Sequence, residues 1–371
     1  METYRQTIYC DLGFLETILS KQDVSQSCLD NSLCIDEEIA TNVRELLLSK
    51  DVNLYLNISQ SEYESIDSNI HKKRLKAAKK GIKAQLTSLE ELFFNIQSKQ
   101  QDNKLHLHTN ASGVSLDESL LQDNFLNAIF FLCESKEACE EAMQEYGVIV
   151  ICLENINEFK HLIFEHGVAF RREEVSSWKD GLSDSKGKFP CNSLIVVDNY
   201  ILNKEKVIDE NLIQIFDLLI PQKLNKSLDF QITIFALLDD GSKSCNAKDR
   251  HAYVEGVLKQ IRPEMKFSIT IIKNAKDKFH DRTIVSSNFY IGCAGGFDLF
   301  KSGVSKKTTT VCAFHPFLYT HNPWSRKAYS DFLNDACHEF FRASDFNEEK
   351  TYLTGVYFGE RKNRLLNQVK K

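Results

Sequence analysis

The sequence has few of the features that mark disordered, secreted or membrane-bound proteins. It contains only five prolines in 371 residues, whereas 42% of its residues are hydrophobic and 25 are phenylalanine. This composition predicts a well-packed globular chain. No apolar run approaches the roughly 18 residues of a transmembrane helix, and the N-terminal stretch METYRQTIYCDLGF lacks the apolar core of a signal peptide. We therefore expect a cytoplasmic protein without a transmembrane segment.

A large excess of one charge is also lacking. The chain has 46 basic and 52 acidic side chains, for a net charge of −6, so any nucleic-acid binding must depend on a local basic surface. None of the 11 cysteines lies at C-x-x-C spacing. Four of them, Cys10, Cys133, Cys152 and Cys293, lie within apolar runs, which predicts buried thiols rather than metal ligands.

Strand-like and helix-like segments alternate along the chain, which is typical of α/β proteins with parallel sheets. At 371 residues the chain exceeds one typical hydrophobic core. We therefore predict two α/β domains, residues 1–165 and 191–371, the second ending in a helical tail. The segment 166–190 is rich in charge, serine and glycine and is predicted as a linker. A long polar helix is expected from about residue 60 to residue 99.

Acidic residues mark the predicted strand ends of the first half. One follows the first strand, one follows the second, two lie on the helix before the third, and one closes the third. They are Asp11, Glu62, Asp117, Asp123 and Glu134. The carboxyl ends of parallel strands share one edge of a sheet, and carboxylates gathered there can bind a divalent metal that activates water. Solvated strand ends and helix caps are the alternative interpretation.

This layout resembles the PIN-like nuclease family over residues 5–160. The resemblance implies a parallel sheet and hydrolysis of nucleic acid with bound Mg²⁺ or Mn²⁺. It assigns catalytic roles to Asp11, Glu62 (with Glu64 as a substitute), Asp123 and Glu134, and metal binding to Asp11, Asp117, Asp123 and Glu134. Either Asp117 or Asp123 would be the inward acid, and Glu134 stands where many members carry aspartate.

A basic stretch in the same half favours a nucleic-acid partner. The run IHKKRLKAAKKGIKAQ places lysines at helical spacing on one face, namely Lys72, Lys76, Lys79, Lys80 and Lys83. Such a face would bind phosphates without reading sequence. A solvated helix face is the alternative.

The second half contains a His-Asp-Arg triplet, His280, Asp281 and Arg282, followed by a strand pair and the turn at Gly295 and Gly296. Histidine can act as a nucleophile or carry protons, arginine can bind phosphate through two hydrogen bonds, and glycines allow backbone amides to approach an anion. A purely structural triad, with Arg282 paired to Asp298 or Asp198, is the alternative.

The triplet is similar to the His-x-Lys motif of the phospholipase D-like superfamily, in which two copies meet to form one site. Arg282 replaces the lysine, and Ser287 stands where that superfamily has an acid. HDRTI and GGFDLF resemble more closely the phospholipase D-like C-terminal domain of MIT-domain proteins, over residues 190–320. That resemblance implies recognition of a phosphate-bearing ligand without established hydrolysis.

We therefore expect a Mg²⁺- or Mn²⁺-dependent nuclease, with RNA as the substrate, joined to a domain that recognises a phosphate-bearing ligand or a partner protein. Analogy with domain fusions suggests bacterial antiviral defence or a toxin-like system. Two alternatives remain open. One is a non-enzymatic sensor or scaffold, and the other is a nuclease that uses His280 in a homodimer.

Overall fold

The computed structural model describes residues 5–19, 35–49, 52–57, 84–87, 126–160, 167–183, 190–238, 247–273, 279, 282–300, 309–315, 323–344 and 357–370. Among these residues no helix is both long and apolar enough to cross a membrane. The described strands form two sheets, one parallel with five strands and one mixed with eight. The predicted α/β class with two sheets is confirmed.

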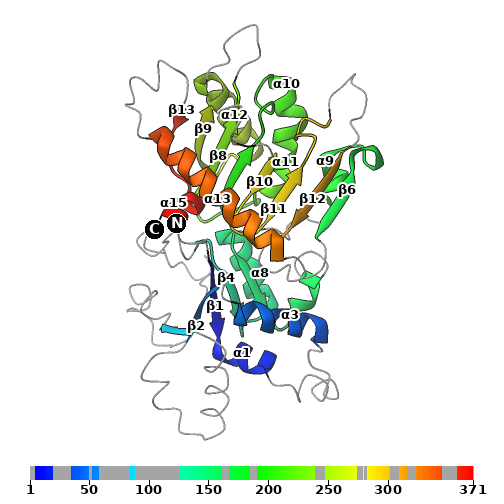
Figure 1. Cartoon of the computed structure of the whole chain (residues 1–371), viewed down its shortest axis with the longest axis vertical. Coiled ribbons are helices and arrows are strands. Elements are labelled where there is room, and N and C mark those ends of the chain that lie inside the picture. The colour runs from blue at the N-terminus through cyan, green and yellow to red at the C-terminus, as the bar shows by residue number, and fades with distance from the viewer. Residues whose placement is uncertain are drawn as a thin grey trace, which may run out of the picture.

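The first sheet, in the lower half of Figure 1, has the order β3-β2-β1-β4-β5. Its strands are β1 (Gln6–Asp11), β2 (Val52–Asn57), β3 (Ala84–Thr87), β4 (Ile129–Leu132) and β5 (Ile149–Cys152). The helices α1 (Leu12–Leu19), α3 (Glu37–Leu48) and α8 (Lys136–Tyr146) connect or flank them. β4 and β5 are continuous runs of buried side chains, as expected for parallel strands covered on both faces.

One element of the first half contradicts the sequence prediction. Residues 84–87 form β3, a parallel strand in register with β2, so the helix predicted over residues 60–99 is wrong at these four positions. Short apolar runs fit helical and extended periods equally well, and here pairing with the edge of β2 determines the structure. The remainder of that prediction lies outside the described residues.

The second sheet, in the upper half of Figure 1, has the order β13-β9-β8-β7-β10-β11-β12-β6. Its strands are β6 (Val168–Arg171), β7 (Ser193–Val197), β8 (Asp229–Ala236), β9 (Lys266–Lys273), β10 (Thr283–Val285), β11 (Tyr290–Cys293), β12 (Thr310–Phe314) and β13 (Tyr357–Gly359). Its helices are α9 (Trp178–Gly181), α10 (Glu205–Val207), α11 (Ile213–Leu219), α12 (Ala247–Ile261), α13 (Pro323–Ser344) and α15 (Arg364–Lys370). β7, β8 and β9 are parallel, and the other pairings are antiparallel.

The segment predicted as a linker, residues 166–190, contributes directly to the second sheet. β6 pairs with β12 at the sheet edge, and Trp178 of α9 is fully buried. The Trp178 ring contacts the rings of Phe170, Phe297 and Phe300. Residues 167–183 are therefore packed structure rather than a plain connector, because their few aromatic side chains outweigh their polar composition.

The two sheets are joined by buried hydrogen bonds between their amino ends. The Asn192 side chain, just before β7, donates from Nδ2 to the carbonyls of Leu126 (2.8 Å) and Tyr146 (2.9 Å), which precede β4 and β5. Asn225 donates to Glu145 Oε1 at 2.8 Å. Buried apolar side chains form one continuous cluster that includes both sheets. Because both sets of strands run away from this joint, their carboxyl ends lie at opposite ends of the molecule (Figure 1).

Candidate functional sites

The order of the first sheet creates a crevice at its centre. From β1 the chain builds outward to β2 and β3 on one side, and then to β4 and β5 on the other. In open α/β sheets, ligands bind outside the carboxyl ends of the strands at the point where the order reverses. That point lies between β1 and β4.

Asp11 is the last residue of β1 and is half-buried at this edge. Its Oδ2 accepts a hydrogen bond from the backbone N–H of Cys133, just after β4, at 2.8 Å. Glu134, the next residue, is also half-buried. Partial burial and then the charge of Asp11 raise the pKa of Cys133 to about 11, and Glu134 adds to the effect. Both carboxylates are thus close enough to act on one thiol.

Of the predicted acids of the first site, Asp11 and Glu134 belong to the described residues. Glu62, Glu64, Asp117, Asp123 and the five lysines of the basic stretch lie outside the described residues. Within the described part of the chain, no three His, Cys, Asp or Glu side chains gather as a metal site would require. Asp11 and Glu134 are carboxylates, the ligand type preferred by Mg²⁺ and Mn²⁺, and both are partly open to solvent. These two residues therefore fit the chemistry of the metal that the sequence predicts.

The predicted burial of the thiols is correct for Cys10, Cys152 and Cys293, which are at most 2% exposed. It is wrong for Cys133, which is exposed because it follows the last residue of β4 and leaves the sheet.

At the carboxyl edge of the second sheet, Asp198 follows β7 and is 1% exposed. Its Oδ1 accepts from the N–H of Tyr200 at 2.8 Å, and its Oδ2 accepts from the N–H of Phe297 at 2.6 Å. Burial raises the pKa of Asp198, while these hydrogen bonds and the charge of Arg282 oppose the shift. Asp198 therefore ties the tip of β7 to the turn that follows β11.

Gly296 lies between the charged groups of this edge. Its φ is +87°, and a Cβ there would lie 3.2 Å from Asp198 Oδ2, 3.4 Å from Asp298 Oδ1 and 3.9 Å from Arg282 Cγ. A side chain at this position would combine strain with crowding. The structure thus brings together the partners of the structural-triad interpretation, Arg282 with Asp198 and Asp298.

The backbone amides of the glycine turn already donate within the chain. Gly295 N–H donates to Thr309 Oγ1 at 3.1 Å, and Gly296 N–H donates to the Cys293 carbonyl at 3.1 Å. Arg282 Nη1 donates to the Ala294 carbonyl at 3.3 Å. Among the described residues of the predicted phosphate site, only the Arg282 guanidinium carries a positive charge. His280 and Asp281 lie outside the described residues.

Ser287 lies at the other end of β10, in the turn to β11, and is fully buried. The position at which the phospholipase D-like superfamily has an acid is therefore remote from Arg282. This placement gives Ser287 no role in proton transfer at the Arg282 edge.

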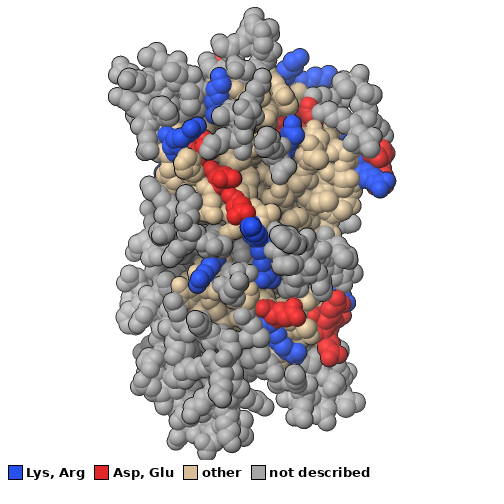
Figure 2. All heavy atoms as spheres, viewed as in Figure 1, with Lys and Arg blue, Asp and Glu red and all other residues tan. Residues whose placement is uncertain are grey.

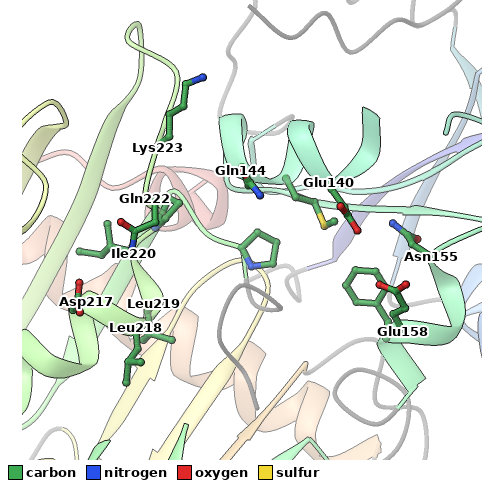
Figure 3. Close-up of a pocket in the computed structure, with 14 residues that line it drawn as sticks. Glu140, Gln144, Asn155, Glu158, Asp217, Leu218, Leu219, Ile220, Gln222 and Lys223 are labelled. Atoms are coloured by element: carbon green, nitrogen blue, oxygen red, sulfur yellow. The ribbon is translucent and has the colours of Figure 1, made fainter. Parts of the chain in front are cut away.

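A third feature is a pocket of about 360 Å³ at the joint (Figure 3). Glu140 and Glu158 line it from the first half, and Asp217, Ile220 and Lys223 line it from the second. Its acids have cationic partners: Lys136 pairs with Glu140 and Glu158, and Arg262 Nη1 is 2.8 Å from Asp217 Oδ1. The pocket therefore has no strong charge preference.

The described basic and acidic side chains visible in Figure 2 are interspersed, without one large basic patch on that face. No protein-family model matches the chain, and no curated protein matches its sequence.

Proposed function

We propose that the N-terminal half is a metal-dependent nuclease acting on RNA, and that the C-terminal half recognises a phosphate-bearing ligand at Arg282. The observation that supports the nuclease most directly is the bond from Cys133 N–H to Asp11 Oδ2. It joins Asp11, at the end of β1, to Cys133 after β4, and Glu134 is the residue that follows Cys133. Two carboxylates at this point of a parallel sheet are suited to phosphodiester hydrolysis.

Asp11 and Glu134 would hold Mg²⁺ or Mn²⁺, together with Glu62 and either Asp117 or Asp123. When bound, such an ion supplies neutralising charge and lowers the pKa of a coordinated water. The hydrogen bond from the Cys133 amide to Asp11 Oδ2 fixes the orientation of the Asp11 side chain. Because both acids are half-exposed, a single-stranded nucleic acid could reach them from solvent. The basic stretch at residues 72–83 would hold that nucleic acid through its phosphates.

At the second site, the planar guanidinium of Arg282 carries several N–H donors, whose geometry suits a phosphate. His280, the preceding residue but one, would add a titratable donor. Asp198 and Asp298 limit how much negative charge this edge accepts, so we propose recognition rather than hydrolysis here. The sensor or scaffold alternative shares this site and differs in requiring no cleavage.

The nuclease proposal predicts that Asp11→Asn and Glu134→Gln lose activity while remaining folded. Asparagine keeps the acceptor for Cys133 N–H but removes the charge that binds the ion. The loss should exceed the roughly 10–100-fold typical of residues that only support metal ligands. Labelled RNA and single-stranded DNA would be incubated with Mg²⁺, Mn²⁺ or EDTA, with melting temperature as the check on folding.

Glu264→Gln is the control, because Glu264 is an exposed acid of the second half. It should cleave like the unmodified protein. Cleavage that persists in EDTA, or full activity of Asp11→Asn, would refute the metal site. Absence of cleavage under every condition would favour the sensor alternative.

A further inference from the structure

The order of the second sheet also reverses at one point, which is the end of β7. From β7 the chain builds outward to β8 and β9 on one side, and β10, β11 and β12 lie on the other. Thr283 of β10 pairs with Val197 of β7 in antiparallel register, so Arg282 and Asp198 are the next positions along the two strands. Ligands of α/β sheets bind outside the carboxyl ends of strands at such a point.

The charges at this point limit how tightly it can hold a phosphate. Arg282 is the cation among the described residues of the predicted phosphate site, and the carboxylates of Asp198 and Asp298 share the space around Gly296 with it. One charge-assisted contact contributes roughly 10- to 150-fold in affinity. A dissociation constant of about 1 mM requires roughly a thousandfold. A ligand at this edge therefore needs a second contact that does not depend on charge.

Tyr200 can provide that contact. It lies two residues beyond Asp198 and is 45% exposed, which makes it the one exposed large hydrophobic side chain among the described residues. Its backbone is held on both sides. The Tyr200 N–H donates to Asp198 Oδ1 at 2.8 Å, and its carbonyl accepts from the N–H of Asn203 at 3.1 Å. The same carboxylate thus ties Tyr200 to the edge that carries Arg282.

The turn that carries Tyr200 is itself anchored in the protein. Ile201 and Leu202, the next two residues, are 0% exposed, and Arg250 Nη2 donates to the Asn203 carbonyl at 2.9 Å. Ile201 and Leu202 therefore supply the apolar contacts of this turn, while the Tyr200 side chain remains open to solvent on a fixed backbone. An aromatic side chain presented in this way loses little conformational freedom when a flat ligand stacks on it.

We propose that the carboxyl edge of the second sheet binds a nucleotide, whose base stacks on the Tyr200 ring and whose phosphate contacts the Arg282 guanidinium. Stacking adds affinity without adding charge, so it is compatible with the nearby carboxylates of Asp198 and Asp298. Every base has an aromatic face, so all four bases should be accepted. This inference names the ligand of the phosphate recognition proposed above and rests on that proposal.

The test titrates the full-length protein in EDTA with AMP, GMP, CMP, UMP and ribose phosphate, which has the sugar and phosphate of a nucleotide but no base. Ligand-observed NMR detects weak binding of this kind. Each nucleotide should bind about 5- to 150-fold more tightly than ribose phosphate, the range expected for stacking of one base. A dinucleotide with a terminal phosphate is then added to the AMP complex. Displacement of AMP would identify the end of a strand as the ligand, and retention of AMP would identify the free nucleotide.

Three variants separate the base contact from the phosphate contact. Tyr200→Ala should remove the preference, so that AMP binds only as tightly as ribose phosphate. Tyr200→Phe should keep the preference, because the ring remains. Arg282→Ala should weaken AMP and ribose phosphate by a similar factor, at least about tenfold. Melting temperatures check that each variant is folded.

Equal affinities of the unmodified protein for AMP and ribose phosphate would overturn this inference and leave phosphate recognition at Arg282 in place. A preference for AMP that survives in Tyr200→Ala would do the same. Tighter binding of inositol phosphate than of AMP would also overturn it, because inositol phosphate carries the phosphate of a lipid headgroup and no base. If neither pyrophosphate nor ribose phosphate bound, the phosphate recognition itself would be wrong, and this inference with it.

Discussion

At the scale of single residues, Gly147 shows how tightly the joint is built. It caps the C-terminal end of α8 with a φ of +62°, and a Cβ there would lie 2.3 Å from the carbonyl oxygen of Cys191 and 2.8 Å from the N atom of Asn192. Both the backbone angle and the space available therefore require glycine. The close approach brings the Asn192 side chain within reach of the carbonyls before β4 and β5.

Gly147→Ala is expected to lower the free energy of unfolding by about 2–5 kcal/mol, from left-handed strain and overpacking together. Gly256→Ala is the matched control. Gly256 lies inside α12, where a Cβ would meet no atom within 4 Å, and alanine there should stabilise the protein by about 0.5–1 kcal/mol. Urea unfolding of both variants measures the difference, and equal effects would contradict this account of the joint.

Individual residues also show what the sequence could reveal of the candidate site. Asp11 directly follows an apolar strand, so its place at a strand end was predictable. Its bond to Cys133 joins residues 122 positions apart and depends on β1 lying beside β4, which no local pattern records. The same holds for Asp198, whose Oδ2 accepts a hydrogen bond from the N–H of Phe297, 99 positions away. Sequence reasoning proposed Asp198 only as a partner of Arg282.

At the scale of elements, local pattern predicts the apolar strands well and the polar or ambiguous ones poorly. β1, β4, β5, β7, β8 and β9 coincide with apolar runs of the sequence. β3 and β6 were missed: both are edge strands, but so is β5, and β5 was predictable because it is a continuous apolar run. An edge strand needs only one hydrogen-bonded neighbour, so it can form from a polar or ambiguous sequence.

Substitution of Trp178 tests whether α9 is packed in the core of the second half. Trp178 Nε1 donates to Asn211 Oδ1 at 3.1 Å, in addition to its three aromatic contacts. Trp178→Ala should lower the free energy of unfolding by about 3–5 kcal/mol, as for other large aromatic side chains removed from a core. Trp178→Phe keeps most of the apolar contact and should cost less.

Chemical denaturation of the two Trp178 variants provides the measurement. A free linker would tolerate both substitutions, so a change below about 1 kcal/mol in Trp178→Ala would mean that α9 does not belong to the core.

At the scale of the whole molecule, stability should depend on pH through His315. This residue follows β12 and is 0% exposed. Burial and then the charge of Arg326 lower its pKa from 6.5 to about 3. The unfolded chain therefore binds a proton on His315 below about pH 6.5, whereas the folded protein does not until about pH 3. The stabilisation is complete above pH 6.5 and is lost as pH falls between these values, by at most about 1.4 kcal/mol per unit.

His315→Gln removes the titration, so its stability should fall less steeply than that of the unmodified protein between pH 6.5 and 4. Urea unfolding at several pH values measures how the free energy of unfolding of each protein changes with pH. The difference between the two proteins removes the contribution of the titratable groups that they share. Parallel curves would show that His315 does not remain neutral in the folded protein.

The placement of the two halves determines how their sites can communicate. At about 3.3 Å per strand residue, Asp198 lies about 17 Å from the start of β7 at Ser193, and Cys133 lies about 13 Å from the start of β4 at Ile129. Since both strands start near the joint and run away from it, the two candidate sites are on the order of 30 Å apart. One phosphodiester cannot contact both, so Arg282 cannot complete the catalytic centre at Asp11 within a single chain.

The final prediction follows from that separation. Arg282→Ala should weaken binding of pyrophosphate, used as a probe in calorimetric titration, by at least about tenfold, because a charge-assisted pair contributes about 1.5–3 kcal/mol. His280→Ala should weaken it as well. Both variants should cleave RNA with Mn²⁺ at nearly the unmodified rate, and Asp11→Asn should bind pyrophosphate normally. If a folded Arg282→Ala or His280→Ala protein lost cleavage but still bound pyrophosphate, the catalytic centre would have to be reassigned to the second sheet. Because the edges of one chain face apart, the homodimer alternative would then be required to bring two copies of His280 together.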